Sequence, residues 1–315
     1  VWGVSLIASY GPTIYNLANI NCLTELNEII DIRNYSKLLH SIKQNKPDII
    51  FHLAAQSIVG KSYEKPIETY STNVMGTVNL LEVIREIENI KCVINVTSDK
   101  CYENRETIVG YKEDETIGGS DPYSNSKGCV ELISDAYRKS YFNELKISLA
   151  TARAGNVIGG GDYNQLRLIP DIFRSIDCNQ PVEIRSLKSI RPWQHVLEPL
   201  FGYIKIAELS YNSLNFSSGW NFGPNNSQTM TVEEVLVFFK KSFPNLQWNV
   251  NENLLFKETK LLQLDVTKAK TFLNWKPKLT NQEALQMTID WYLSSKKKDD
   301  MRNVTKKQIL NYMNI

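Results

Sequence analysis

Cys92-Val-Ile-Asn-Val-Thr-Ser-Asp-Lys100 is the stretch that decides the fold, because a short apolar run ends there in a polar cluster. The run from 92 to 96 is rich in β-branched residues, which is typical of a buried strand in a parallel sheet. Parallel sheets carry their chemistry at the carboxyl ends of their strands. The sequence therefore predicts a site at Ser98, Asp99 and Lys100, unless these residues only turn the chain.

A second stretch, Tyr123-Ser-Asn-Ser-Lys127, is predicted to face the first one from the start of a helix. Asp121 can cap this helix and Pro122 suits its first turn. Residues four apart project from the same helix face, which brings Tyr123 and Lys127 together. A phenol has an ordinary pKa of about 10, and a neighbouring cation favours the phenolate. We therefore expect Lys127 to lower the pKa of Tyr123, so that its phenolate can take a proton from a hydroxyl group.

Strands and helices alternate along the first half of the chain. Predicted strands at 48–53, 92–96 and 146–150 are separated by predicted helices at 68–86 and 122–141. This alternation is typical of an α/β protein with a Rossmann-like, doubly wound parallel sheet. The predicted parts are a sheet domain at 1–156 to which 190–222 partly returns, a smaller mixed α/β substrate lobe at 157–189 and 223–295, and a solvated charged tail at 296–315.

Composition excludes several classes of protein. The chain has 315 residues, 42% of them hydrophobic and 22% charged, with a net charge of +2, so no broad basic face for nucleic acid is expected. Five cysteines form no C-x-x-C pair and no zinc spacing with the three histidines, which predicts no metal site and favours reduced thiols in a cytoplasm. No apolar run reaches the roughly 18 residues of a membrane span.

Several further motifs carry a resemblance that covers nearly the whole chain. They are His52-Leu-Ala-Ala-Gln56, Thr72-Asn-Val-Met-Gly-Thr77, Asn95-Val-Thr-Ser-Asp-Lys-Cys-Tyr-Glu-Asn104, Gly118-Gly-Ser-Asp-Pro-Tyr-Ser-Asn-Ser-Lys-Gly128, Ala152-Arg-Ala-Gly-Asn-Val-Ile-Gly-Gly-Gly-Asp162, Ile190-Arg-Pro-Trp-Gln-His-Val-Leu-Glu-Pro199 and Trp220-Asn-Phe-Gly-Pro224. In these motifs the chain resembles the extended short-chain dehydrogenase/reductases and, within them, the CDP-glucose 4,6-dehydratases. The related dTDP-glucose dehydratases have Glu where this chain has Lys100.

The resemblance implies a lyase that dehydrates CDP-glucose to CDP-4-keto-6-deoxyglucose, in deoxysugar synthesis for bacterial surface polysaccharide such as lipopolysaccharide O-antigen. Tyr123 would accept the proton of the glucose 4-hydroxyl, with Ser98 bonded to the 4-oxygen and Lys127 beside the phenol. Asp99 would give a proton to the departing C6 hydroxyl. Lys100 would remove the C5 proton or, alternatively, stabilise an enolate by its charge.

The resemblance also implies NAD as the cofactor and assigns binding residues. Besides Tyr123 and Lys127, the cofactor contacts would be Asp31, Ile32, Leu53, Ala54, Ala55 and Asn73. The substrate contacts would be Asn156, Arg167, Arg191 and Asn221. Each arginine could instead form a surface ion pair, and Asn221 could tie a strand to a loop.

The glycine-rich turn with which this family opens is absent, together with its strand and helix, because the chain begins where the second strand is expected. We therefore expect an interrupted sheet, and a polypeptide of this extent that is inactive or unstable although its parent is an enzyme. The resemblance implies a homodimer through the helices at 68–86 and 122–141. The alternatives are another nucleotide-sugar dehydratase, a 4-epimerase that does not need Asp99 and Lys100, and a non-catalytic relic that still dimerises.

Overall fold

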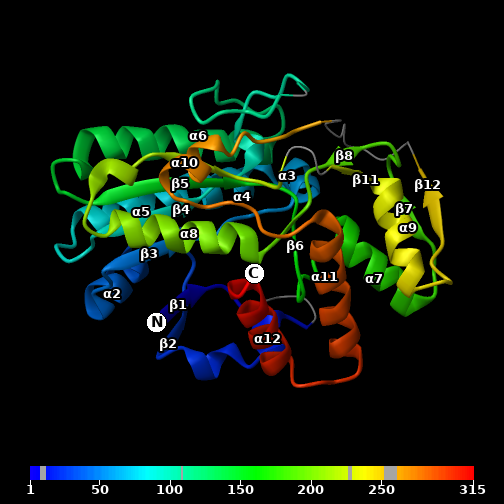
Figure 1. Cartoon of the computed structure of the whole chain (residues 1–315). Coiled ribbons are helices and arrows are strands. Elements are labelled where there is room, and N and C mark those ends of the chain that lie inside the picture. Colours follow the sequence, from blue (N-terminus) through cyan, green and yellow to red (C-terminus); the bar gives the residue numbers. More distant parts are fainter. Residues whose placement is uncertain (8–11, 108, 226–228, 252–260) are drawn as a thin grey trace.

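The computed structural model describes residues 1–315 except 8–11, 108, 226–228 and 252–260. Figure 1 shows a larger lobe built on a sheet and a smaller lobe beside it. The main sheet is parallel, with the strand order β10-β5-β4-β3, formed by Gly219–Phe222, Ser148–Ala154, Cys92–Val96 and Ile49–His52. The predicted α/β fold with a parallel sheet is confirmed.

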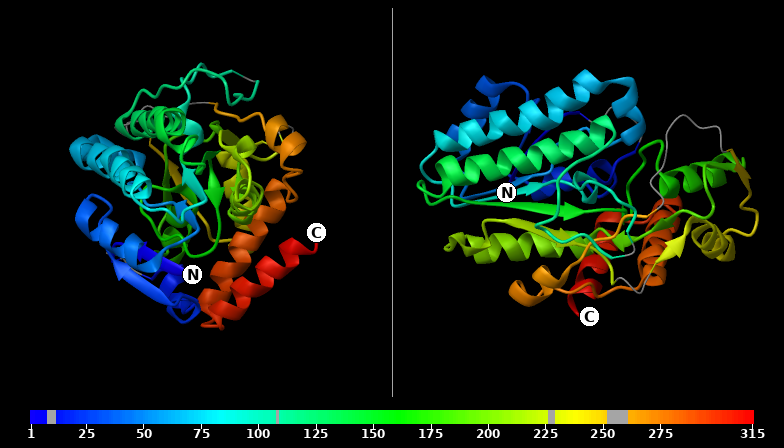
Figure 2. Two further views of the ribbon diagram at one scale, coloured as in Figure 1. Left: turned by 90° about the vertical axis from the view of Figure 1, so that its left-hand side faces the viewer. Right: turned by 90° about the horizontal axis from the view of Figure 1, so that it is seen from above.

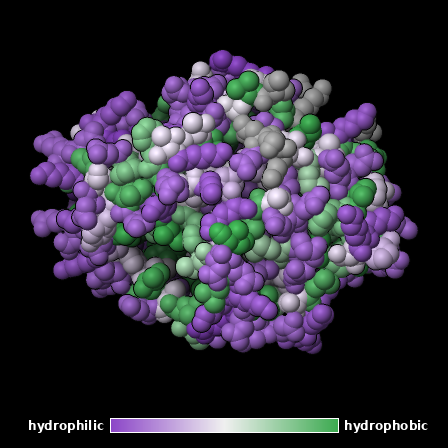
Figure 3. All heavy atoms as spheres, viewed as in Figure 1, coloured by the Kyte–Doolittle hydropathy of each residue, from purple (hydrophilic) through white to green (hydrophobic). Residues whose placement is uncertain are grey.

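A second, two-stranded parallel sheet lies apart from the main one. It consists of β1 (Trp2–Ser5) and β2 (Leu26–Ile29), and within the described residues neither strand pairs with β3. Phe51 in β3 and Ile29 in β2 are exposed, although β-strands of this composition are usually covered. Figure 3 shows hydrophobic residues around a hollow on the side where α8, β3 and the β1–β2 pair lie. The sheet is therefore present in two parts.

Helices cover both faces of the main sheet (Figure 2). Side chains of α2 (Tyr35–Asn45) and α5 (Gly76–Arg85) pack with Val93 and Leu149, whereas α8 (Leu197–Ser210) packs with Cys92 and Ile94 on the opposite face. Val93 packs on the opposite face of the sheet from Cys92 and Ile94, because successive side chains of a strand point to opposite faces. The predicted helix at 68–86 is α4 (Pro66–Tyr70), a π-helical turn η2 (Ser71–Met75) and α5; that at 122–141 is α6 (Pro122–Tyr137) with a π-turn η4 (Arg138–Phe142).

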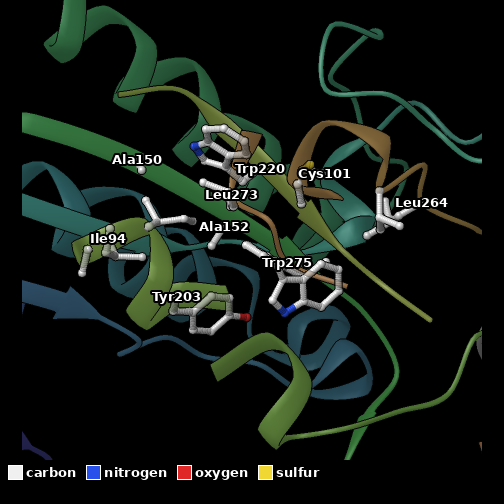
Figure 4. Close-up of a cluster of buried hydrophobic side chains, with 14 of the residues drawn as sticks. Ile94, Cys101, Ala150, Ala152, Tyr203, Trp220, Leu264, Leu273 and Trp275 are labelled. Carbon is white, nitrogen blue, oxygen red and sulfur yellow. The ribbon is translucent and has the colours of Figure 1, made fainter. Parts of the chain in front are cut away.

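The core beneath α8 is closed by residues from the far end of the chain. Figure 4 shows Ile94, Ala150 and Ala152 of the sheet packed with Trp220 of β10 and with Leu264, Leu273 and Trp275. The prediction that residues 223–295 all belong to the smaller lobe is wrong for the part that includes α10 (Thr267–Phe272). That segment packs on β10 because its apolar side chains complete the core of the larger lobe.

The smaller lobe has a core of its own. Phe173 stacks on Tyr292 and meets Phe239 edge to face, which joins its three long helices. These are α7 (Leu168–Cys178), α9 (Val232–Ser242) and α11 (Asn281–Lys296), with the parallel strands β7 (Val182–Ile184) and β12 (Trp248–Val250). The remaining short elements are α1 (Ile14–Leu17), η1 (Ile20–Leu23), α3 (Val59–Glu64), η3 (Asp99–Cys101), β6 (Val157–Ile158), β8 (Ile190–Arg191), β9 (Gln194–His195), η5 (Leu214–Phe216) and β11 (Met230–Thr231).

The expectation of a solvated tail at 296–315 is wrong. Helix α12 (Met301–Met313) begins at Asp300, whose side chain caps it, and buries Met301 and Tyr312. The phenol of Tyr312 donates a hydrogen bond of 2.6 Å to Oε2 of Glu198, while Oε1 of Glu198 accepts from two backbone amides ahead of α11. Charged residues dominate 296–300 in sequence, but two well-spaced apolar residues are enough to dock the helix that follows.

We expect Tyr312→Phe to lower the free energy of unfolding by roughly 1–3 kcal/mol, because the buried carboxyl of Glu198 loses a donor that nothing replaces. Urea denaturation measures this as a lower midpoint with an unchanged slope. Tyr211→Phe is the matched control, since Tyr211 is 37% exposed. Equal midpoints for the two variants would contradict the docking of α12.

Candidate active site

The segment after β4 carries a hydroxyl group and a carboxyl group at the carboxyl end of the sheet. Oγ of Ser98 donates a hydrogen bond of 3.0 Å to Oδ1 of Asp99 and accepts one of 3.2 Å from the backbone amide of Lys100. Ser98 thereby caps η3, the turn that contains Asp99. Both side chains are buried, whereas Lys100 on the same turn is only partly buried. Ser98, Asp99 and Lys100 therefore lie on one short turn directly after β4.

Helix α6 brings a phenol and an amine to the same place. The side chain of Asp121 accepts a hydrogen bond from the amide of Ser124 and caps the helix, with Pro122 in the first turn. Tyr123 is hydrogen-bonded to Ser98. Nζ of Lys127 donates a hydrogen bond of 3.0 Å to the backbone oxygen of Val96, the last residue of β4. The structure therefore brings Ser98, Asp99, Tyr123 and Lys127 together.

The pKa of Tyr123 differs from the sequence-based expectation. Burial raises it to about 12, and only the hydrogen bond with Ser98 and the charge of Arg167 oppose this shift. Lys127, whose ammonium group donates to the end of β4, is not among the groups that shift it. The expected lowering by Lys127 is wrong for this arrangement. The phenol holds its proton at neutral pH until another charge or hydrogen bond near it changes.

Burial also shifts the pKa of the two groups beside the phenol. It lowers the pKa of Lys127 to about 8, while the charges of Glu131 and Cys101 act in the opposite direction. It raises the pKa of the Asp99 carboxyl, and the charge of Lys100 and the hydrogen bond from Ser98 oppose that rise. A raised pKa favours the protonated form of a carboxyl group, which is the form that can donate a proton. Asp99 is therefore suited to general acid catalysis.

The predicted cofactor contacts lie along the ends of β2 and β3. Leu53 and Ala54 are exposed and Ala55 is partly so, which leaves the backbone after β3 open to a ligand. Asp31 is ion-paired with Arg33, and Ile32 is buried beneath α5.

Asn73 lies in the π-helical turn η2 and does not face an open site. Its Oδ1 accepts a hydrogen bond of 2.7 Å from the amide of Gln56, and its Nδ2 donates one of 2.9 Å to Oγ of Ser126. Only 1% of the residue is exposed. Asn73 thus ties the loop after β3 to α6 between Tyr123 and Lys127.

The predicted substrate contacts do not all reach the site. Arg167 and Arg191 are partly buried, and their charges act on Tyr123 and Asp99 respectively. Asn156 is partly buried in the left-handed conformation with φ 50°, after β5. Asn221 is fully buried: its Oδ1 accepts from Tyr102, and its Nδ2 donates to the backbone oxygens of Tyr111 and Asp265. Its assignment to the substrate is wrong, because every polar atom of its amide is used inside the protein.

Gly155 and Gln194, which were not predicted as site residues, line a small pocket together with Asp99. A Cβ on Gly155 would lie 1.8 Å from Oδ2 of Asp99, so only glycine fits there. Nε2 of Gln194 donates hydrogen bonds to the backbone oxygens of Gly155 and Phe222, at 3.1 and 2.9 Å. Glu131 is a further buried carboxylate near the site. Its place four residues after Lys127, on the same helix face, was a signal in the sequence.

Two kinds of feature are not found among the described residues. None of the helices in that part of the chain is long and apolar enough to cross a membrane. In the same residues no three His, Cys, Asp or Glu side chains are grouped so that they could hold a metal ion.

Comparisons with known proteins agree with this geometry. The family model described as GDP-mannose 4,6 dehydratase matches residues 25–288. The chain is 48% identical to CDP-glucose 4,6-dehydratase of Salmonella typhimurium, over 99% of this chain and 89% of that protein. It is 22% identical to dTDP-glucose 4,6-dehydratase of Xanthomonas campestris, over 84% of this chain and 78% of that protein.

Solved structures show the same fold. A dTDP-glucose 4,6-dehydratase from Bacillus anthracis, in complex with NAD, has a TM-score of 0.76 at 22% identity and covers 96% of this chain and 90% of its own. A UDP-glucuronic acid 4-epimerase from Bacillus cereus has a TM-score of 0.78 at 21% identity, over 92% of this chain and 90% of its own. With the family model and the 48% identity, these findings establish that the chain belongs to the GDP-mannose 4,6 dehydratase family of extended short-chain dehydrogenase/reductases.

Proposed function

We propose that this protein dehydrates CDP-glucose to CDP-4-keto-6-deoxyglucose with NAD as its cofactor. One observation carries the proposal: a carboxyl group with a raised pKa, Asp99, is hydrogen-bonded to Ser98, which is hydrogen-bonded to the phenol of Tyr123. Ser98 and Tyr123 suit the oxidation of a sugar hydroxyl, and an adjacent proton donor suits the departure of a second one as water. The 48% identity to the Salmonella typhimurium enzyme supports the same substrate.

The residues present fit the nicotinamide half of NAD. The backbone at Leu53 and Ala54 is open beside β3, and Tyr123 and Lys127 face the adjacent strand end. Asp31 follows β2 at the same edge and could accept hydrogen bonds from the adenosine half. Bound NAD would supply a reversible hydride acceptor, which no amino-acid side chain provides.

Side chains of this protein would handle the protons. Tyr123 takes the proton of the 4-hydroxyl as C4 is oxidised to a ketone, with Ser98 bonded to the 4-oxygen. The ketone acidifies the C5 hydrogen, which Lys100 removes, or whose loss it favours by stabilising the enolate with its charge. Asp99 then donates its proton to the C6 hydroxyl, the C6–O bond breaks and water leaves. Hydride returned to C6 and a proton at C5 complete the 4-keto-6-deoxy sugar.

The binding of the nucleotide diphosphate is assigned to Arg167 and Arg191. Guanidinium groups donate paired hydrogen bonds to phosphate oxygens. Both arginines are partly buried, and their charges act on the phenol and the acid. Arg167 is also ion-paired with Asp162 at 2.8 Å, with 37% of its side chain exposed. Nη2 of Arg167 also donates to Oγ of Ser57, on the loop after β3. Asn156, at the end of β5, is the remaining candidate contact.

The direct experiment offers several sugar nucleotides to the purified protein. With NAD, CDP-glucose should give a product that has lost water and absorbs in alkali as 4-keto-6-deoxy sugars do, and dTDP-glucose and GDP-mannose should react far more slowly. A preference for either of the latter would make the protein another dehydratase. Conversion of CDP-glucose to a 4-epimer would refute dehydration.

We further propose a homodimer formed through α4, η2, α5 and α6. Ile67, Met75 and Leu132 on these helices are 84%, 52% and 61% exposed, and a second copy would cover these side chains.

We also propose a cytoplasmic location. It is supported by five free cysteines, of which Cys92 and Cys101 are buried thiols.

We expect Asp99→Asn to slow release of the dehydrated product roughly 100-fold or more while oxidation at C4 persists, because the amide cannot donate the carboxyl proton. Cofactor reduction followed by absorbance separates the two stages. In the unchanged enzyme, elimination should fall as pH rises through the raised pKa of Asp99, since the protonated form is the active one. Asp114→Asn, on an exposed loop, is the control. Full turnover by Asp99→Asn would point to an epimerase.

Leu132→Glu should shift the protein from dimer to monomer, because a charge replaces an exposed apolar side chain within the proposed interface. Light scattering coupled to size exclusion reports the mass. Leu310→Glu on α12, where Leu310 is 46% exposed, is the matched control and should stay dimeric. A monomeric parent protein, or equal masses for both variants, would contradict the interface.

A further inference from the structure

The segment Thr97–Tyr102, which carries Ser98, Asp99 and Lys100, is held at its two ends. At the first end, Oγ1 of Thr97 donates a hydrogen bond of 2.5 Å to Oε1 of Glu131. At the second end, the phenol of Tyr102 accepts a hydrogen bond of 2.6 Å from Nη1 of Arg153. Four residues lie between these ends, and two of them, Ser98 and Asp99, carry their side chains to the site. Their position therefore depends on where Glu131 and Arg153 lie.

Glu131 and Arg153 form one buried ion pair. Nη2 of Arg153 lies 2.7 Å from Oε2 of Glu131, and the side chains are only 6% and 4% exposed. Oε2 of Glu131 also accepts a hydrogen bond of 2.8 Å from Thr151, so the pair joins α6 to β5. Burial alone would disfavour the charge of Glu131, but Arg153 and these hydrogen bonds outweigh it and lower the pKa of the carboxyl. Both ends of the segment Thr97–Tyr102 are thus hydrogen-bonded to the buried ion pair of Glu131 and Arg153.

The same carboxylate lies on the helix that carries the other half of the site. Glu131 follows Lys127 by one turn and Tyr123 by two turns of α6. The titratable groups whose charges interact with Lys127 are Glu131 on its own helix, Cys101 on η3 and His52 on β3. Burial lowers the pKa of His52 to about 3, so it is neutral at working pH, and Cys101 is a buried thiol with a raised pKa. Glu131 is the anion in this set.

We propose that Glu131, paired with Arg153, is a positioning residue that fixes Ser98 and Asp99 relative to Tyr123 and Lys127. The inference rests on the proposed dehydratase function. A pair that served stability alone would not need to bond the residue before Ser98 and the residue after Cys101. A misplacement of reacting groups by about 1 Å can cost roughly 100-fold in rate. Loss of the pair should therefore be seen in catalysis and not only in folding.

The first test is Glu131→Gln, which keeps the shape and removes the charge. In this variant kcat for CDP-glucose should fall roughly 10- to 100-fold, with KM changed by less than about threefold. The alkaline limb of the pH profile of kcat should also move to lower pH. Burial already lowers the pKa of Lys127 to about 8, and the negative charge of Glu131 opposes this shift. Without that charge the pKa of Lys127 falls further, so the amine loses its proton at a lower pH. Glu131→Asp should recover part of both losses.

Glu198→Gln is the matched control for a purely structural role. Glu198 is as buried as Glu131 and also accepts three hydrogen bonds, but these come from Lys278, Leu279 and Tyr312. This variant should unfold at lower urea concentration with unchanged kcat and pH profile. If Glu131→Gln behaves like Glu198→Gln, the inference is wrong.

Thr97→Val is a second test, which also serves if Glu131→Gln does not fold. It breaks the link between the segment and Glu131 but leaves the ion pair of Glu131 and Arg153 intact. It removes the hydrogen bond of Thr97 to Glu131 at similar volume, so kcat should fall at least about tenfold while KM holds. Thr97→Ser keeps the hydroxyl group and should restore kcat. Wild-type kcat for Thr97→Val would overturn the inference. Failure of the unchanged protein to dehydrate any sugar nucleotide would instead refute the proposed function, so the two failures are distinguishable.

Discussion

The close approach of α6 to the carboxyl end of β4 is the contact on which the rest of the structure depends. Nζ of Lys127 caps the last carbonyl of the strand, and Glu131 bonds the first residue beyond it. A parallel sheet supplies the strand end, and a capped helix supplies a face with Tyr123 and Lys127 one turn apart. Both are rigid elements, which hold reacting groups better than loops do.

Burial at this contact sets the chemistry by acting on each group differently. It raises the pKa of Tyr123 to about 12, so that the phenol is protonated at neutral pH, it raises the pKa of Asp99, and it lowers the pKa of Lys127. The shift favours Asp99 as a proton donor, whereas Tyr123 must lose its proton before it can act as a base. The charge that favours this loss has to come from a ligand or from a shift of Lys127 away from Val96. Groups whose pKa values are pushed apart in this way are typical of acid and base pairs in enzymes.

Local rules predicted the parts of the fold and site that depend on local sequence. Asp121, Pro122, Tyr123 and Lys127 lie where helix capping and spacing put them, and 92–96 is a buried strand. Contacts between distant residues were harder to predict. The alternative that Asn221 ties a strand to a loop holds, through Tyr102, Tyr111 and Asp265, whereas the docking of α12 by Tyr312 was not expected from composition. The position of Lys127 against a carbonyl and the burial that raises the pKa of Tyr123 also depend on tertiary packing. Spacing on a helix gives proximity but not the direction of a hydrogen bond.

The central claim is that one closed site oxidises C4 and reduces C6 of the same bound sugar. CDP-glucose that carries deuterium at C4 and carbon-13 throughout its glucose ring tests it most directly, when mixed with unlabelled substrate in ordinary water, because the carbon-13 marks which product comes from the labelled substrate. The account predicts that product from labelled substrate carries the deuterium at C6 and that product from unlabelled substrate carries none. Deuterium retained at C4, lost to water or passed to unlabelled molecules would contradict it.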